Sequence, residues 1–266
     1  NGVSLTTSFQ VIENPLKTYM EYVSKVRRID FKENVPMAWT TEENFRERLE
    51  DQTEDKTDQF MKIETSLKAF GIIGENRFTE NESIKDTIIN LKSNNVAGFY
   101  NPSSDKFFMV ERGDEINDSV AVHELTHALQ DQHFNLETIP IEQENNDDLA
   151  LAVQALVEGE ATYVQTKYQF EEKRGRNLES ALDTIKNNLR NSLNSYESSL
   201  ISGNAPLFLT KLMEFPYIGG MRFVLEGVSE DWERINRAYS NLPSSTEQIL
   251  HPQKYFKDKD HPTILT

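Results

Sequence analysis

Two histidines and a glutamate form the pattern His-Glu-x-x-His at residues 123–127 of this 266-residue chain, within a predicted helix at 118–132. Residues four apart lie on one face of a helix, so the imidazoles of His123 and His127 can bind one metal ion. Imidazole nitrogens suit zinc. Glu124 lies beside the metal rather than against it, where its carboxylate can take a proton from a water molecule. The pattern therefore predicts a zinc site with Glu124 as a general base.

The residues around this motif indicate that its helix is buried. Apolar side chains surround it on almost every side: Val120, Ala121, Val122, Leu125, Ala128 and Leu129. Two buried histidines on one face need partners for their nitrogen atoms. This favours a metal site over an exposed helix that carries two solvated histidines.

A catalytic zinc ion needs a third protein ligand and an open position. His133 follows His127 by six residues, which is the spacing of the metzincin motif. Gln130, however, stands where that motif has a glycine that turns the chain, and it favours a continuing helix. On a continuing helix His133 lies about 240° round from His127, away from the metal. We therefore expect His133 to be a helix-end or core histidine.

A better third ligand lies on the next predicted helix, at 148–170. Glu158 is a carboxylate on a mostly apolar face, and the small residues Ala155 and Ala161 on either side of it permit close helix packing. A buried carboxylate needs a charge partner, which a metal ion supplies. Glu160 is two residues further on and points elsewhere, so we expect it to support the site indirectly or to face solvent. The predicted metal ligands are His123, His127 and Glu158.

These motifs resemble the gluzincin metallopeptidases, which include thermolysin-like and aminopeptidase N-like families. The chain has H-E-L-T-H at 123–127 and E-G-x-A-x-Y at 158–163, and in gluzincins the glutamate of the second segment is the third zinc ligand. The wider sequence is similar to a little-characterised bacterial group. That similarity rests on V-A-G-F-Y-N-P at 96–102, V-H-E-L-T-H-A-L-Q-D-Q-H-F at 122–134, E-G-E-A at 158–161 and S-T-E-Q-I-L-H-P at 245–252.

The resemblance implies zinc-dependent hydrolysis of a peptide or protein substrate in a zincin-like fold. It also implies an edge strand near the metal that pairs with an extended substrate, for which 96–100 is the candidate. The chain departs from the best-known gluzincins in two respects. Thirty residues separate His127 from Glu158, and Thr162 stands where thermolysin-like enzymes have an aspartate that orients a ligand histidine. Two alternatives remain: an inactive binding or regulatory protein, and a hydrolase of non-peptide amides or esters.

Peptide hydrolysis also needs a donor for the negative oxygen that develops beside the metal. Gluzincins use a downstream histidine or tyrosine. His251, held between a capped short helix and Pro252, is the first candidate for this second catalytic residue. Tyr217, Tyr239 and Arg222 are the alternatives.

The remaining pattern predicts a single α+β unit that is predominantly helical. We expect a helical N-terminal part at 1–95, a zinc-binding core at 96–172 and a helical C-terminal lobe at 173–266. Two β-rich runs around an Asn-Pro turn predict a hairpin at 96–110, and a short run at 35–39 that contains Pro36 is at most an edge strand. Further helices are expected at 182–200, 207–214 and 217–226.

The composition excludes several classes of protein. The chain has 28 Lys and Arg residues against 44 Asp and Glu, a net charge of −16, so it repels nucleic acid and anionic lipid. It has no cysteine, so any zinc site must use histidine and carboxylate ligands. No apolar run approaches the ~18 residues of a transmembrane helix. The acidic surface and a first residue other than Met fit an extracytoplasmic protein, either periplasmic, cell-surface or secreted.

Overall fold

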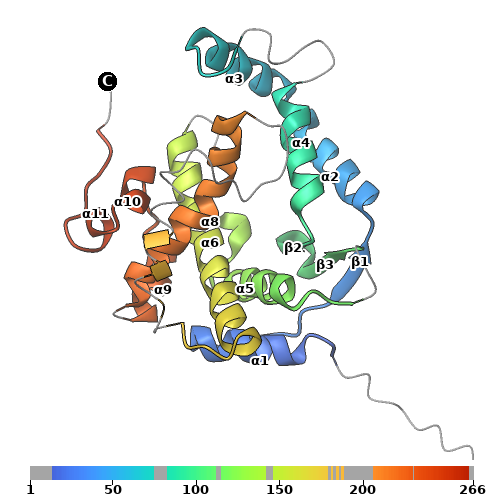
Figure 1. Cartoon of the computed structure of the whole chain (residues 1–266), viewed down its shortest axis with the longest axis vertical. Coiled ribbons are helices and arrows are strands. Elements are labelled where there is room, and N and C mark those ends of the chain that lie inside the picture. The colour runs from blue at the N-terminus through green and yellow to red at the C-terminus, as the bar shows by residue number, and fades with distance from the viewer. Residues whose placement is uncertain are drawn as a thin grey trace, which may run out of the picture.

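The computed structural model describes residues 14–74, 83–111, 115–141, 146–178, 206–229 and 231–263, together with 181, 184, 185, 187 and 188. Most of the expected helix at 182–200 lies outside these residues. The described helices are α1 (Lys17–Arg27), α2 (Glu42–Glu54), α3 (Thr57–Ala69), α4 (Ile84–Asn95), α5 (Asp118–Phe134), α6 (Asp147–Tyr168), α8 (Leu207–Val228), α9 (Trp232–Ser240), α10 (Thr246–Leu250) and α11 (Gln253–Phe256). Shorter helical turns are η1 (Pro102–Ser104), η2 (Leu136–Thr138) and η3 (Gln169–Lys173). The described structure is α+β and predominantly helical, as predicted (Figure 1).

One small sheet completes the described secondary structure. Its strands are β1 (Met37–Thr40), β2 (Gly98–Asn101) and β3 (Lys106–Val110), in the order β1-β3-β2. The predicted hairpin is confirmed, because β2 and β3 pair antiparallel around η1. β1 pairs parallel with β3 and forms one edge of the sheet, as Pro36 predicts. β2 forms the opposite edge, which faces α5.

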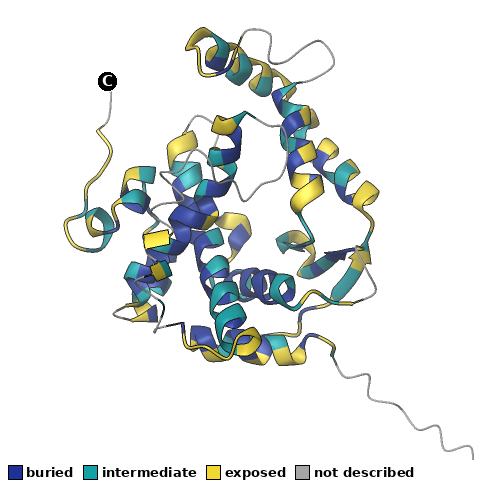
Figure 2. Cartoon of the chain, in the orientation of Figure 1, coloured by how far each residue is buried: buried dark blue, intermediate teal, exposed yellow. Residues whose placement is uncertain are grey.

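Helix α5 lies at the centre of the molecule. The side chain of Asn117 accepts hydrogen bonds from the N–H groups of Ser119 and Val120 and so caps its first turn, and Asn135 ends it in the left-handed conformation at φ 55°. Ten consecutive residues, 121–130, are buried. Figure 2 shows α5 in the buried colour over most of its length. The burial expected from its apolar sequence is therefore confirmed.

Helices α6 and α8 cross at two glycines. A Cβ atom on Gly159 would overlap the backbone of Gly220, and one on Gly220 would overlap the carbonyl oxygen of Ala155. Only glycine permits this approach, and the two backbones are in direct contact. The crossing fixes where the neighbouring residue Glu158 lies on α6 and which residues of α8 lie opposite it.

Helix α8 differs from expectation in its continuity. The sequence predicted separate helices at 207–214 and 217–226, but Leu207–Val228 is one helix with Pro216 inside it. Proline removes one backbone hydrogen bond from a helix interior. Pro216 is buried, and α8 as a whole packs extensively against α6, which helps to hold the helix together.

The main hydrophobic core joins residues from all three predicted parts of the chain. It includes Leu16 and Val23 near the N-terminus, Leu125 and Leu156 in α5 and α6, and Phe223 in α8. Helices α3 and α4 project away from it and pack on smaller apolar clusters (Figure 1). Within the described residues, no helix combines the length and apolar character needed to cross a membrane.

Candidate metal centre

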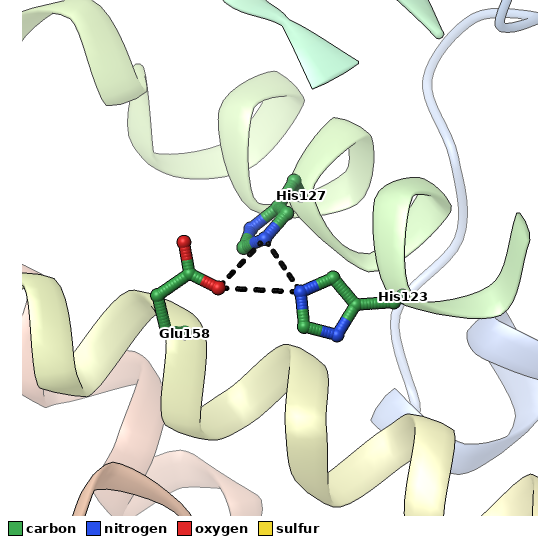
Figure 3. A group of neighbouring side chains, drawn as sticks. All are labelled: His123, His127 and Glu158. Atoms are coloured by element: carbon green, nitrogen blue, oxygen red, sulfur yellow. Dashed lines mark hydrogen bonds and ion pairs between the residues drawn. The ribbon is translucent and has the colours of Figure 1, made fainter. Parts of the chain in front are cut away.

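Three side chains from α5 and α6 converge in the way the sequence predicts. Nε2 of His123 and Nε2 of His127 lie 3.2 Å apart, and Oε2 of Glu158 lies 3.2 Å from the first and 3.4 Å from the second (Figure 3). Among the described residues these form the only group of three or more histidine and acidic side chains whose ligand atoms all lie within 4.8 Å of one another. The helix spacing places both imidazoles on one face of α5, and α6 brings Glu158 opposite them.

The charges at this cluster favour a cation. Burial alone would raise the pKa of Glu158, but the charge of His127 and hydrogen bonds with both imidazoles outweigh it and hold that pKa well below its usual value. Burial alone would lower the pKa of His127, but the negative charge of Glu158 raises it to about 9. A proton on His127 therefore balances the carboxylate, and a bound metal ion can take its place.

Glu124 lies beside the three ligands rather than among them. Its side chain is buried, and its Oε2 accepts a hydrogen bond of 2.8 Å from the backbone N–H of Tyr100 in β2. Burial raises the pKa of Glu124, and so does the charge of Glu158, against the lowering effect of the two histidines and the Tyr100 N–H. A raised pKa moves a carboxylate toward the range in which a general base works best.

The structure does not bring His251 to this cluster. Its imidazole is about half exposed directly after the short helix α10, and its Nε2 lies 3.8 Å from the carboxylate of Glu247 in that helix. Helix α10 packs against α6 and α8, and His251 follows its last residue with its side chain partly in solvent. The candidate chosen from sequence is therefore poorly placed to contact a reacting group.

Tyr217, a weaker candidate in the sequence, is close to the cluster. Its ring centroid lies 6.2 Å from that of His123. The negative charge of Glu158, together with burial and the charge of Glu124, raises the pKa of Tyr217 well above its ordinary value. The residue is 38% exposed, so its ring also borders solvent. The α6–α8 crossing explains this placement, because Tyr217 precedes Gly220 by one turn.

The other two candidates for the oxygen donor lie elsewhere. The hydroxyl of Tyr239 donates a hydrogen bond to Oε2 of Glu160 at 2.8 Å, deep in the core. Arg222 follows Tyr217 by five residues and so lies about 140° round α8 from it. Tyr217 is therefore the best placed of the four.

Two further residues fall outside the cluster. His133 bonds through Nε2 to the backbone oxygen of Asp30 at 2.8 Å, which agrees with a helix-end role. Glu160 is completely buried and forms an ion pair with Arg27. The expectation that Glu160 faces solvent is therefore wrong, and its partners among the described residues, Arg27 and Tyr239, belong to α1 and α9.

Comparisons of the chain with protein-family models, with curated protein sequences and with solved structures found no match.

Proposed function

We propose that this protein is a zinc metallopeptidase with a zincin-like fold, and that His123, His127 and Glu158 hold the metal. The observation that carries the proposal is the convergence of two imidazole nitrogens and one carboxylate oxygen beside a separate buried glutamate. These three side chains suit a zinc ion, because two nitrogen donors and one oxygen donor match catalytic zinc sites, which keep one position open. A zinc ion bound there would polarise a substrate carbonyl and lower the pKa of a water molecule.

Glu124 is the general base of the proposed reaction. Its carboxylate accepts the proton of the attacking water molecule and then donates it to the amine that leaves. The Tyr100 N–H fixes one of its oxygens, which leaves the other to face the reacting groups. A raised pKa suits a group that must both accept and donate the proton.

The edge strand β2 supports a peptide as the substrate. Within the described residues β2 pairs with β3 on one side and with no strand on the other, where its Tyr100 N–H bonds to Glu124. An extended peptide that adds to this edge would bring a carbonyl group near Glu124, because the Tyr100 N–H already reaches that carboxylate. Backbone pairing holds a peptide by groups that every residue has, so side-chain preference depends on other contacts.

Tyr217 is the proposed donor to the negative oxygen of the transition state, in place of His251. Its hydroxyl keeps its proton because nearby carboxylates raise its pKa. Removal of one such donor typically lowers kcat about 10²–10³-fold. We expect Tyr217→Phe to lower kcat by about this factor with zinc still bound, and His251→Gln to leave kcat within about twofold. The opposite pattern would restore His251 as the donor.

The experiment that tests the proposed function compares Glu124→Gln with the wild-type protein in zinc content and in cleavage of a peptide library. We expect both proteins to bind one zinc ion and the variant to lose cleavage by at least about 100-fold, because general bases contribute about 10²–10⁴-fold. Glu137→Gln is the matched control, since Glu137 is an exposed residue of η2. Unchanged cleavage in Glu124→Gln contradicts the mechanism. Zinc binding by a wild-type protein that cleaves no peptide contradicts the peptidase function and favours a binding protein.

A further inference from the structure

A glutamine that no catalytic motif requires lies against one ligand histidine. Nδ1 of His127 lies 2.8 Å from Oε1 of Gln130, and Nε2 of Gln130 donates to the carbonyl oxygen of Val157 at 3.0 Å. Gln130 is 1% exposed. It comes three residues after His127 on α5, and Val157 precedes the ligand Glu158 on α6. One side chain thus connects the two ligand-bearing helices directly behind the site.

The bonding partners determine which way the glutamine amide points. A carbonyl oxygen can only accept a hydrogen bond, so the group that faces Val157 must be the amide NH₂. The amide oxygen then faces His127, and it can only accept. Nδ1 of His127 must therefore carry a proton, and the proton that a bound metal ion displaces is the one on Nε2, which faces Nε2 of His123 and Oε2 of Glu158.

The chain of polar contacts continues beyond Gln130. Gln130 also influences Tyr239, whose pKa it lowers against the larger rise from burial and Glu160, and the Tyr239 hydroxyl donates a hydrogen bond to Oε2 of Glu160 at 2.8 Å. Glu160 cannot donate in return, because it is ion-paired with Arg27 in the fully buried interior. Burial and the charge of Glu160 raise the pKa of Tyr239 well above its ordinary value, so the hydroxyl keeps its proton.

We propose that Gln130, which bonds to both His127 and Val157 and lies next to the Tyr239–Glu160 pair, fixes a proton of His127 on Nδ1 and so holds Nε2 ready for the metal. This inference rests on the proposed metal site and deepens it. Gln130, Tyr239 and Glu160 are positioning residues that act through His127. Because Glu160 is ion-paired with Arg27, its carboxylate can only accept the hydrogen bond from Tyr239. The Val157 carbonyl oxygen can likewise only accept from Gln130, so the donor in each of these hydrogen bonds is determined.

His123 provides a contrast within the same site. Its Nδ1 is buried and has no hydrogen-bond partner among the described residues. The two ligands are four residues apart on one helix, yet only His127 has a protein group that sets its proton. The proposal therefore predicts unequal behaviour of the two imidazoles.

The test measures zinc affinity by competition with a chelator for Gln130→Leu and for Gln132→Leu. Gln132 is a matched control, because it is also on α5 and its side chain bonds to the backbone at residues 32 and 33, away from the site. Loss of a partner that orients a metal ligand typically costs about 10–100-fold in affinity. We expect that loss in Gln130→Leu and a change within about threefold in Gln132→Leu. Equal affinities of Gln130→Leu and the wild type would overturn the proposal.

A second pair of variants tests the longer link. Tyr239→Phe keeps the ring that stacks on Phe134 but removes the hydroxyl between Gln130 and Glu160. We expect a smaller loss of zinc affinity, about 3–10-fold, because Val157 still orients the amide. Tyr255→Phe, which removes a hydroxyl bonded to the Asn241 carbonyl oxygen, is the control and should change nothing. Equal zinc affinities in the two variants would remove Tyr239 and Glu160 from the chain.

Hydrogen exchange in the wild-type protein tests the same role of Gln130, whether or not Gln130→Leu folds. In the zinc-loaded protein, NMR should show slower hydrogen exchange at Nδ1–H of His127 than at Nδ1–H of His123. Equal or reversed rates contradict the chain. The outcome is separable from that of the proposed function: zinc binding without peptide cleavage rejects the peptidase, whereas normal cleavage by Gln130→Leu with normal zinc affinity rejects only the chain.

Discussion

Glu158 and Glu160 are two residues apart on α6, yet their surroundings differ completely. Glu160 is fully buried against Arg27, a cation that cannot give up its charge, and accepts a further bond from Tyr239. Glu158 has a side chain 18% exposed, and its partners are two imidazoles that can each lose a proton. The first carboxylate is neutralised permanently by the protein. The second is neutralised by a group that a metal ion can replace, and this difference separates a structural charge pair from a ligand set.

The largest expected effect is on folding, from Glu160→Gln. Removal of one member of a buried ion pair leaves the other charge uncompensated and costs about 3–5 kcal/mol. We expect the free energy of unfolding, measured with urea on the metal-free protein, to fall by about that amount. Glu158→Gln is the internal comparison, and its cost should be smaller, because its imidazole partners can lose their protons when the carboxylate is removed. Equal losses in the two variants would remove the distinction between the two carboxylates.

The next effect is on metal binding, from Glu158→Gln. An amide in place of the carboxylate removes the one negative charge among the three ligands, and we expect zinc affinity to fall by more than about 100-fold. Chelator competition measures the affinity, and circular dichroism should show an intact helical fold. Zinc affinity equal to that of the wild type would mean that another residue supplies the third ligand.

A pH dependence of the metal-free protein follows from His127. Its pKa is raised to about 9 by Glu158 from an ordinary value of 6.5. A raised pKa stabilises the folded state fully below pH 6.5, and that contribution is lost as the pH rises through about 9. Unfolding experiments on the metal-free protein should therefore show stability falling between pH 6.5 and 9. Glu158→Gln removes the cause of the shift, so a similar fall in that variant would contradict the assignment.

The smallest expected effect comes from Thr162→Asp. Thr162 lies one turn after Glu158, and its buried hydroxyl has no hydrogen-bond partner among the described residues. Nδ1 of His123 is likewise buried without a partner in the described part of the chain, and Thr162→Asp tests whether α6 can supply its acceptor. We expect zinc affinity to rise by about 3–10-fold. Thr166→Asp, one turn further along α6, is the control, and the same gain there would point to a general effect of added charge.

The sequence predicted the parts of the site that follow from local spacing. The imidazoles of His123 and His127 meet because they are four residues apart on a helix, and Glu158 was recognisable as a carboxylate on an apolar face. The helix bounds of α5 and α6 agree with the prediction to within two residues. The hairpin also followed from its turn residues.

The sequence did not predict contacts that depend on how distant helices cross. The pairing of Arg27 with Glu160 joins residues 133 positions apart, and no local pattern reports it. Tyr217 was undervalued because its place beside His123 depends on the glycine contact of α6 with α8. Gln130 was interpreted only as a residue that continues the helix, which is correct but omits its bond to His127.

The most direct test of the central claim is a structure of the zinc-loaded protein with anomalous scattering measured at the zinc edge. We predict one zinc ion bound by Nε2 of His123, Nε2 of His127 and a carboxylate oxygen of Glu158, with the carboxylate of Glu124 beside it and unbound. Zinc located at any other group of residues, or ligated by His133 in place of Glu158, would contradict the account.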